Sequence, residues 1–160
     1  MAQHNPCLSP TDIVRKLLAN TLNEDVLGEL VAPDATYISL TYDNPELTKI
    51  LPWAGTSPTG GAAAIIKAFG GVEQHWQNEL FEILTCFCVD EDVAVFGKFT
   101  YRSKTLGKAS TSPFAMWCKV RDGRIIFLQF LEDSFGTTNT FYTGGQRTFN
   151  TIHTKREIEI

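Results

Sequence analysis

The chain has 160 residues, of which 43% are hydrophobic, 20% charged and 11% aromatic, with a formal net charge of -4. This length fits one domain with one core, and this composition excludes disordered, collagen-like and low-complexity classes. An acidic chain without a basic field is not expected to bind nucleic acid or an anionic membrane, and no apolar stretch approaches the ~20 residues that span a bilayer. Residues 1–10 lack the basic end and apolar run of a signal peptide, so we expect a cytoplasmic protein.

Helical signals come first along the chain. Ser9 suits a helix N-cap, Pro10 suits the first helical position, and apolar residues then recur at helical spacing over 13–22. A second short helix is expected from a cap at Asn23 to a stop before Pro33, because a residue that precedes proline resists the helical region.

The middle of the chain predicts a strand, a loop and a third helix. Residues 35–42 are rich in Tyr, Ile and Thr, which favours a strand that ends at 43–45. After a loop with prolines and glycines, apolar spacing predicts a helix over 61–76. The alternative is an early end or a kink at Gly70 and Gly71, because glycine has a low helical preference.

The second half of the chain predicts four long strands joined by short turns, over 78–89, 93–104, 110–120 and 124–133. Such hairpins make a mainly antiparallel sheet, and helices followed by hairpins indicate an α+β fold with helices on one face of a curved sheet. Both faces of the last two strands are mostly apolar, whereas a sheet of this kind usually exposes one face to water. The second cover is expected to be another copy of the chain, so we predict a homodimer through the sheet.

Metal and cofactor motifs are not evident in the sequence. It contains no phosphate loop or Rossmann fingerprint, the three histidines are too scattered for a local metal motif, and the Cys-x-Cys pair has neither redox nor zinc-finger spacing. We therefore expect no cofactor and no metal, and interpret all four cysteines as reduced thiols of the core: Cys7, Cys86, Cys88 and Cys118.

Several of these segments, in this order, resemble the NTF2-like superfamily, and most closely its SnoaL-like branch related to ketosteroid isomerases. They are the N-terminal helices, Pro-Asp-Ala-Thr at 33–36, Pro-Trp-Ala-Gly-Thr at 52–56 before a helix that begins with glycine, and Asp-Gly-Arg-Ile at 122–125. The resemblance covers 9–135. It implies a cone-shaped α+β barrel of the cystatin-like kind, in which a curved sheet wraps the helices around a small-molecule pocket, commonly in a homodimer.

The two ends of the chain lie outside this resemblance. Residues 1–8 are expected to be flexible. Residues 136–160 are expected to form an extension that packs over the pocket mouth or the dimer partner, or that frays at its very end.

The resemblance does not carry over the catalytic residues of its best-known members. Ketosteroid isomerases have an Asp as general base where this sequence has Ser39. They have a second Asp, in the oxyanion hole, where this sequence has Ala115. The water-activating residues of the related limonene-epoxide hydrolases fall at Gly97, Phe99 and Phe130.

The acidic end of the last strand remains as a candidate site. Glu132 and Asp133 alternate between the two faces of the strand, so only one can point into the cavity unless a bulge intervenes. A carboxyl group in an aromatic pocket has a raised pKa and can act as a general acid or base; the alternative is a solvated or salt-bridged strand end. His75 is a third catalytic candidate, and its alternative is a helix-end histidine that caps carbonyl groups.

Aromatic residues are numerous enough to line a pocket, although they could equally fill a core. The candidate ligand-binding residues are Tyr37, Ser39, Trp53, Trp76, Phe99, Tyr101, Ala115, Trp117, Leu128 and Phe130. Tyr37 and Tyr101 could also present hydroxyl groups to a carbonyl or an enol.

Three functions fit these features. The first is a protein that binds a hydrophobic small molecule without chemistry, as the missing family residues favour. The second is a cofactor-independent isomerase, cyclase or dehydratase in which Glu132 or Asp133 moves a proton. The third is a protein-interaction module with a filled cone.

Overall fold

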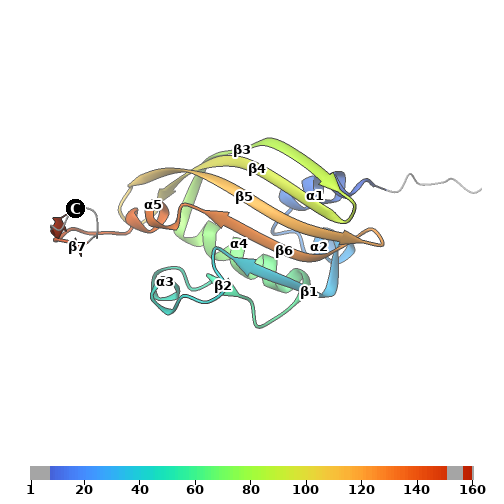
Figure 1. Ribbon diagram of the computed structural model, residues 1–160, viewed down its shortest axis with the longest axis horizontal. Coiled ribbons are helices and arrows are strands. Elements are labelled where there is room, and N and C mark those ends of the chain that lie inside the picture. The colour runs from blue at the N-terminus through green and yellow to red at the C-terminus, as the bar shows by residue number, and fades with distance from the viewer. Residues whose placement is uncertain (1–7, 151–156, 160) are drawn as a thin grey trace, which may run out of the picture.

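The computed structural model describes residues 8–150 and 157–159, and one curved six-stranded sheet forms its body. The strands of this sheet are β1 (Val31–Ser39), β2 (Gly55–Thr56), β3 (Trp76–Val89), β4 (Asp92–Ser103), β5 (Ala109–Arg121) and β6 (Arg124–Glu132). The helices are α1 (Pro10–Leu18), α2 (Glu24–Leu30), α3 (Pro45–Ile50), α4 (Gly61–His75) and α5 (Ser134–Asn139), and β7 (Thr148–Asn150) pairs with β8 (Glu157–Glu159). Figure 1 shows the sheet curving over α4, with α1 and α2 near one end and α5 at the opposite end.

The order of strands across the sheet is β2-β1-β6-β5-β4-β3. The strands β3 to β6 form successive antiparallel hairpins, and β2 is antiparallel to β1. Only the β1 and β6 pair is parallel within this sheet, so the predicted α+β fold with a mainly antiparallel curved sheet is confirmed.

The first two helices begin as their caps predict. The Ser9 hydroxyl accepts from the Asp12 amide at 3.2 Å, and the Asn23 side chain accepts from the Val26 amide at 3.1 Å. Each cap satisfies an amide that no helical carbonyl can reach.

The helix predicted over 61–76 is observed as α4, which runs through both glycines to His75 instead of ending early. A Cβ atom at Gly71 would lie 2.5 Å from the Trp53 ring. Glycine therefore allows the loop before β2 to pack directly on this helix, and here its small size matters more than its weak helical preference.

Other differences from the predicted elements lie in short segments. The strand β1 starts at Val31, directly after α2, and its pairing with β6 is irregular between Val31 and Thr36, where Pro33 has no amide to donate. The helix α3 occupies what was predicted to be loop, and α5 begins where the last predicted strand ends.

The core lies between α1, α4 and the concave face of the sheet. It contains Ile13, Val14, Leu17, Ile65, Val93, Val95, Phe99, Met116 and Leu128 among its fully or almost fully buried side chains. Cys118 is buried and Cys86 half-buried, but Cys88 is exposed because it lies one residue before the end of the edge strand β3. The prediction of a core thiol is therefore wrong for Cys88, and Cys7 lies outside the described residues.

Candidate active site

Glu132 is the last residue of β6, and its side chain lines a small cavity between the concave face of the sheet and α4. One carboxyl oxygen, Oε1, accepts a hydrogen bond from the Thr137 hydroxyl at 2.8 Å. Burial raises the pKa of Glu132 to about 7; the Thr137 hydrogen bond opposes this rise, and the charge of Asp133 adds to it. A carboxyl group with this pKa is present as both acid and base near neutral pH.

Two tyrosines accompany this carboxyl group in the cavity. Tyr37 on β1 and Tyr101 on β4 are 4% and 5% exposed. Burial raises the pKa of both phenols, the negative charge of Glu132 raises both further, and a hydrogen bond to Ser39 opposes the rise at Tyr37. Both tyrosines therefore stay protonated and can donate hydrogen bonds.

The cavity around Glu132 has a volume of about 20 Å³. This is enough for one water molecule, which needs ~10–15 Å³, or for a single reacting group. The other residues that line it are Ser39, Leu40, Trp53, Ala68, Phe69, Val72 and Phe130.

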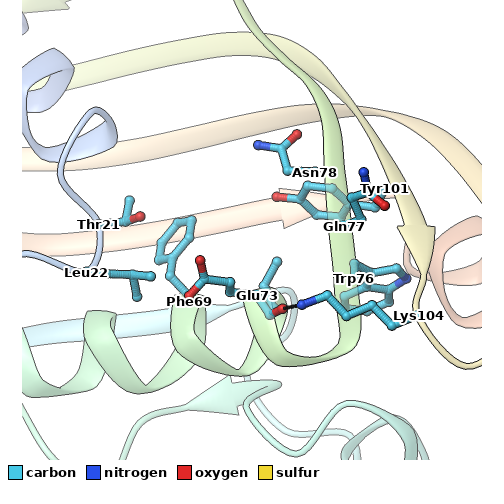
Figure 2. A pocket seen from close by; sticks show the side chains of 10 residues that line it. Thr21, Leu22, Phe69, Glu73, Trp76, Gln77, Asn78, Tyr101 and Lys104 are labelled. Atoms are coloured by element: carbon cyan, nitrogen blue, oxygen red, sulfur yellow. Dashed lines mark hydrogen bonds between the residues drawn. The ribbon is translucent and has the colours of Figure 1, made fainter.

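A larger pocket of about 410 Å³ adjoins this cavity and shares Phe69, Val72 and Tyr101 with it. Its volume falls in the range of about 300–1,000 Å³ that ligand sites usually have. Figure 2 shows the pocket between α4, the start of β3 and the turn that carries Thr21 and Leu22. The three shared side chains therefore lie between a molecule in this pocket and the cavity that Glu132 lines.

The walls of the larger pocket are partly aromatic and partly polar. Trp76 stacks on Tyr101 with 5.8 Å between the ring centroids. At the rim, the Lys104 ammonium group donates to the Glu73 backbone carbonyl, and the amides of Gln77 and Asn78 also line the pocket (Figure 2). The lining therefore combines aromatic faces with hydrogen-bonding groups.

Most predicted ligand-binding residues thus line one of these two adjoining spaces. Ser39, Trp53 and Phe130 line the cavity with both tyrosines, and Trp76 lines the larger pocket. Phe99 and Leu128 are 0% and 1% exposed and pack in the core. Phe99 stacks on Tyr101 with 4.1 Å between the ring centroids, so it supports the wall without lining it.

Ala115 and Trp117 lie on the convex face, which corrects their assignment to the pocket. The alternation along β5 gives the concave face to Phe114, Met116 and Cys118 instead. The Trp117 side chain is 42% exposed, and its indole donates to Asp92 at 2.6 Å.

Asp133 and His75 have local structural roles. The Asp133 carboxylate accepts from the Gly136 amide at 2.9 Å and so caps α5, pointing away from the cavity that Glu132 lines. The His75 Nδ1 atom lies 2.8 Å from the Gly71 carbonyl oxygen, and its ring packs edge-on against Trp53. His75 lines neither the cavity nor the adjoining pocket.

Sequence reasoning missed other residues around this site. Phe69 and Val72 have the helical spacing of core residues, and nothing distinguishes a pocket wall from a core in that pattern. No sequence pattern indicates a role for Thr137, because it lies on α5, a helix that the sequence did not predict.

Neither a metal cluster nor a membrane-spanning helix is found in the part of the chain that the structure describes. No three side chains of His, Cys, Asp or Glu there are placed to hold a metal ion. No helix of residues 8–150 has the length and apolar character to cross a membrane.

Two fungal proteins are similar to this chain along most of its length. Patulin biosynthesis cluster protein F of Penicillium expansum is 42% identical over 147 residues, which cover 86% of this chain and 74% of that protein. Patulin synthesis protein F of Aspergillus clavatus is 40% identical over 136 residues, which cover 83% and 69% of the two chains.

Solved structures share the fold at low sequence identity. An NTF2-like protein of Burkholderia thailandensis has a TM-score of 0.68 at 17% identity, over 84% of this chain and 98% of its own. IdmH of Streptomyces antibioticus, proposed to be a polyketide cyclase, has a TM-score of 0.66 at 14% identity, over 84% and 99% of the two chains. TerC, crystallised with polyporic acid, has a TM-score of 0.65 at 19% identity, over 82% and 98%.

The sequence profile of the SnoaL-like domain matches residues 14–128, which include β1, α4 and most of the sheet. The resemblance seen in the sequence is thereby confirmed, and the chain belongs to the SnoaL-like family, with the NTF2-like fold.

Proposed function

We propose that this protein is a cofactor-independent enzyme that moves a proton on a small unsaturated carbonyl compound, with Glu132 as general acid and base. The observation that carries this proposal is the Glu132 carboxyl group, with a pKa of about 7, in a cavity that two protonated tyrosines share. Desolvating a carboxyl group without a cationic partner costs stability, and a catalytic role explains why the cost is tolerated.

The chemistry proceeds in two balanced steps. The Glu132 carboxylate removes a proton from a carbon next to the substrate carbonyl, while a tyrosine hydroxyl donates a hydrogen bond to the carbonyl oxygen and stabilises the enolate. The Glu132 carboxylic acid then returns the proton to a different atom, which isomerises the substrate. No electrons are gained or lost overall, so the steps require no redox partner.

The substrate class is inferred from the pocket and from the relatives. An aromatic wall with a polar rim suits a planar, oxygenated ring better than a long isoprenoid chain. The curated relatives are named for patulin synthesis, and the structural neighbours include a protein proposed to be a polyketide cyclase and one crystallised with polyporic acid. We therefore propose a small polyketide-derived enone with a hydrogen-bearing saturated carbon next to its carbonyl group as the substrate.

Deuterium exchange tests this function without knowledge of the natural substrate. The protein is incubated in deuterated buffer with a panel of hydroxylated cyclohexenones, and deuterium incorporation next to the carbonyl is followed by proton NMR. Glu132→Gln should lower the exchange rate by at least about 100-fold with little change in affinity, because it removes the base but keeps the shape. Asp133→Asn is the matched control and should retain exchange, since asparagine also caps a helix.

The alternative function, binding without chemistry, makes a different prediction for the same panel. Compounds would then bind, as calorimetry would show, but no compound would exchange protons faster than in buffer. That result would overturn the enzyme proposal.

The predicted homodimer forms a second part of this proposal. Four large apolar side chains on the convex face, one on each of four neighbouring strands, are between 42% and 51% exposed. They are Phe87 (51%), Phe96 (46%), Trp117 (42%) and Leu131 (42%). The charges among them are already paired, as Lys98 with Glu82 at 3.0 Å and Lys119 with Asp92 at 2.8 Å. An apolar face with internally paired charges is self-complementary, so we propose that a second copy covers it.

A further inference from the structure

The hydroxyl group of Thr137 contacts the proposed catalytic carboxyl group from outside the region that the family profile matches. Thr137 is fully buried, and its Oγ1 atom lies 2.8 Å from Glu132 Oε1. The same Oγ1 atom lies 3.2 Å from the Asp133 carbonyl oxygen and 3.4 Å from that of Ser134. The hydroxyl proton therefore has a carboxylate and two backbone carbonyls as alternative acceptors.

The nearest of these acceptors, Glu132 Oε1, can accept this hydrogen bond in both protonation states of Glu132. When Glu132 is a carboxylate, the Thr137 hydroxyl donates to Oε1. When Glu132 carries the substrate proton on its other oxygen, Oε2, Oε1 is the carbonyl oxygen of the acid and still accepts from the Thr137 hydroxyl. One oxygen of the carboxyl group is thus held in both states, and the other remains available to the cavity.

The short helix α5 is fixed at both ends, which fixes Thr137. At its start, the Asp133 carboxylate caps Gly136, and the Asp133 amide donates to the buried Ser112 hydroxyl at 2.9 Å. Just beyond its end, Thr140 accepts from the Trp76 indole at 2.8 Å and from the Ser103 hydroxyl at 2.9 Å. The three strands β3, β4 and β5 therefore hold the helix that presents Thr137.

Few other groups can influence the Glu132 carboxyl group. The charge of Asp133, after β6, raises the pKa of Glu132, and the charge of Glu132 in turn raises the pKa of Tyr37 on β1 and Tyr101 on β4. The helix α4 presents only Ala68, Phe69 and Val72 to the cavity, and no lysine, arginine or histidine is among the described residues that line it. The Thr137 hydroxyl is thus the group that favours the carboxylate.

We propose that Thr137 is a positioning residue for Glu132, whose hydroxyl holds one carboxyl oxygen through both steps of proton transfer. The proposal rests on the proposed function for its catalytic meaning. The effect of the Thr137 hydrogen bond on the pKa of Glu132 can be measured whether or not the protein turns over a substrate.

Titration of Glu132 in the protein alone tests this inference. The protein is labelled with ¹³C at the glutamate carboxyl carbons, and the Glu132 signal is assigned by its loss in Glu132→Gln. Thr137→Val keeps the shape and removes the hydroxyl, so it should raise the Glu132 pKa by about one unit. Thr137→Ser should restore the wild-type titration, because it keeps the donor.

Thr138→Val is the matched control on the same helix. The Thr138 hydroxyl donates to the Ser134 carbonyl at 2.6 Å and makes no contact with Glu132, so this variant should leave the titration unchanged. If Thr137→Val does not fold, Thr137→Cys supplies a weaker donor of similar size and should shift the pKa in the same direction.

The outcomes separate the inference from the proposed function. An unchanged Glu132 titration in Thr137→Val, or equal shifts in Thr137→Val and Thr138→Val, would overturn the role of Thr137. A shifted titration in a protein that exchanges no substrate protons would leave the positioning intact and overturn the enzyme. In an active protein, the pH profile of deuterium exchange should move with the titration.

Discussion

The two faces of the sheet differ in how their ionisable side chains are partnered. On the concave face, Glu132 lies in a cavity with two tyrosines and no counterion among its described lining residues. On the convex face, carboxylates lie beside cations, as Glu82 lies beside Lys98 at 3.0 Å. Exposed ion pairs contribute little to stability, whereas an unpaired buried carboxyl group is costly. The sheet thus has a concave face on which a buried carboxyl group costs stability and a convex face whose apolar residues are suited to association.

A charge on the convex face should give the largest effect. Phe96→Asp places a carboxylate among the exposed apolar residues, and burying it unpaired against a second copy should weaken dimerisation by about 1,000-fold, or about 4 kcal/mol. Sedimentation velocity at micromolar concentration would show this as a change from dimer to monomer.

Leu106→Asp is the control for that experiment. Leu106 is 41% exposed, close to the 46% of Phe96, but it lies in the turn between β4 and β5. This variant should remain dimeric. A wild-type monomer, or a Phe96→Asp protein that still dimerises, would contradict the proposed interface.

The buried Glu132 carboxyl group on the concave face should make the stability of the protein depend on pH. Since the folded-state pKa of Glu132 is about 7 and the ordinary value is 4.5, the folded state binds its proton more tightly than the unfolded state does. Stability relative to Glu132→Gln should therefore be greatest below about pH 4.5 and should fall as the pH rises to about 7, by up to about 3 kcal/mol. Urea unfolding of the wild type and of Glu132→Gln at about pH 5 and about pH 8 measures this difference. The same pH dependence in both proteins would show that Glu132 is not desolvated.

The two faces also differ in what an aromatic substitution should do to turnover. Tyr101→Phe keeps the stacking on Trp76 and Phe99 but removes the hydroxyl group, and should lower kcat for deuterium exchange by up to about 100-fold. Trp117→Phe on the convex face should change kcat by less than about twofold, since it touches only the outer surface. Equal losses in both variants would indicate a general effect on folding instead.

The sequence predicted the fold better than it predicted the site. Period-two alternation and turn residues placed the four long strands, because each signal is local to a few residues. The family resemblance placed Ser39 where it lines the cavity but put Ala115 in the pocket, because a one-residue error along a strand exchanges its two faces. Trp117 was assigned to the pocket only because it is aromatic, and it lies on the convex face. Thr137 could not be found, since its contact with Glu132 depends on a helix whose position is fixed by distant strands.

The smallest expected effect concerns the two neighbouring carboxyl groups at the end of β6. Asp133→Ala removes the cap of α5, so it should destabilise the protein by about 1 kcal/mol, and Asp133→Asn should cost much less. Turnover should fall only slightly in Asp133→Ala, because the bonds of Thr140 to Trp76 and Ser103 still hold the far end of the helix. Thermal unfolding and deuterium exchange of the two variants measure both quantities. A loss of turnover as large as that of Glu132→Gln would mean that Asp133, the residue on the outward side of the same strand end, takes part in proton transfer itself.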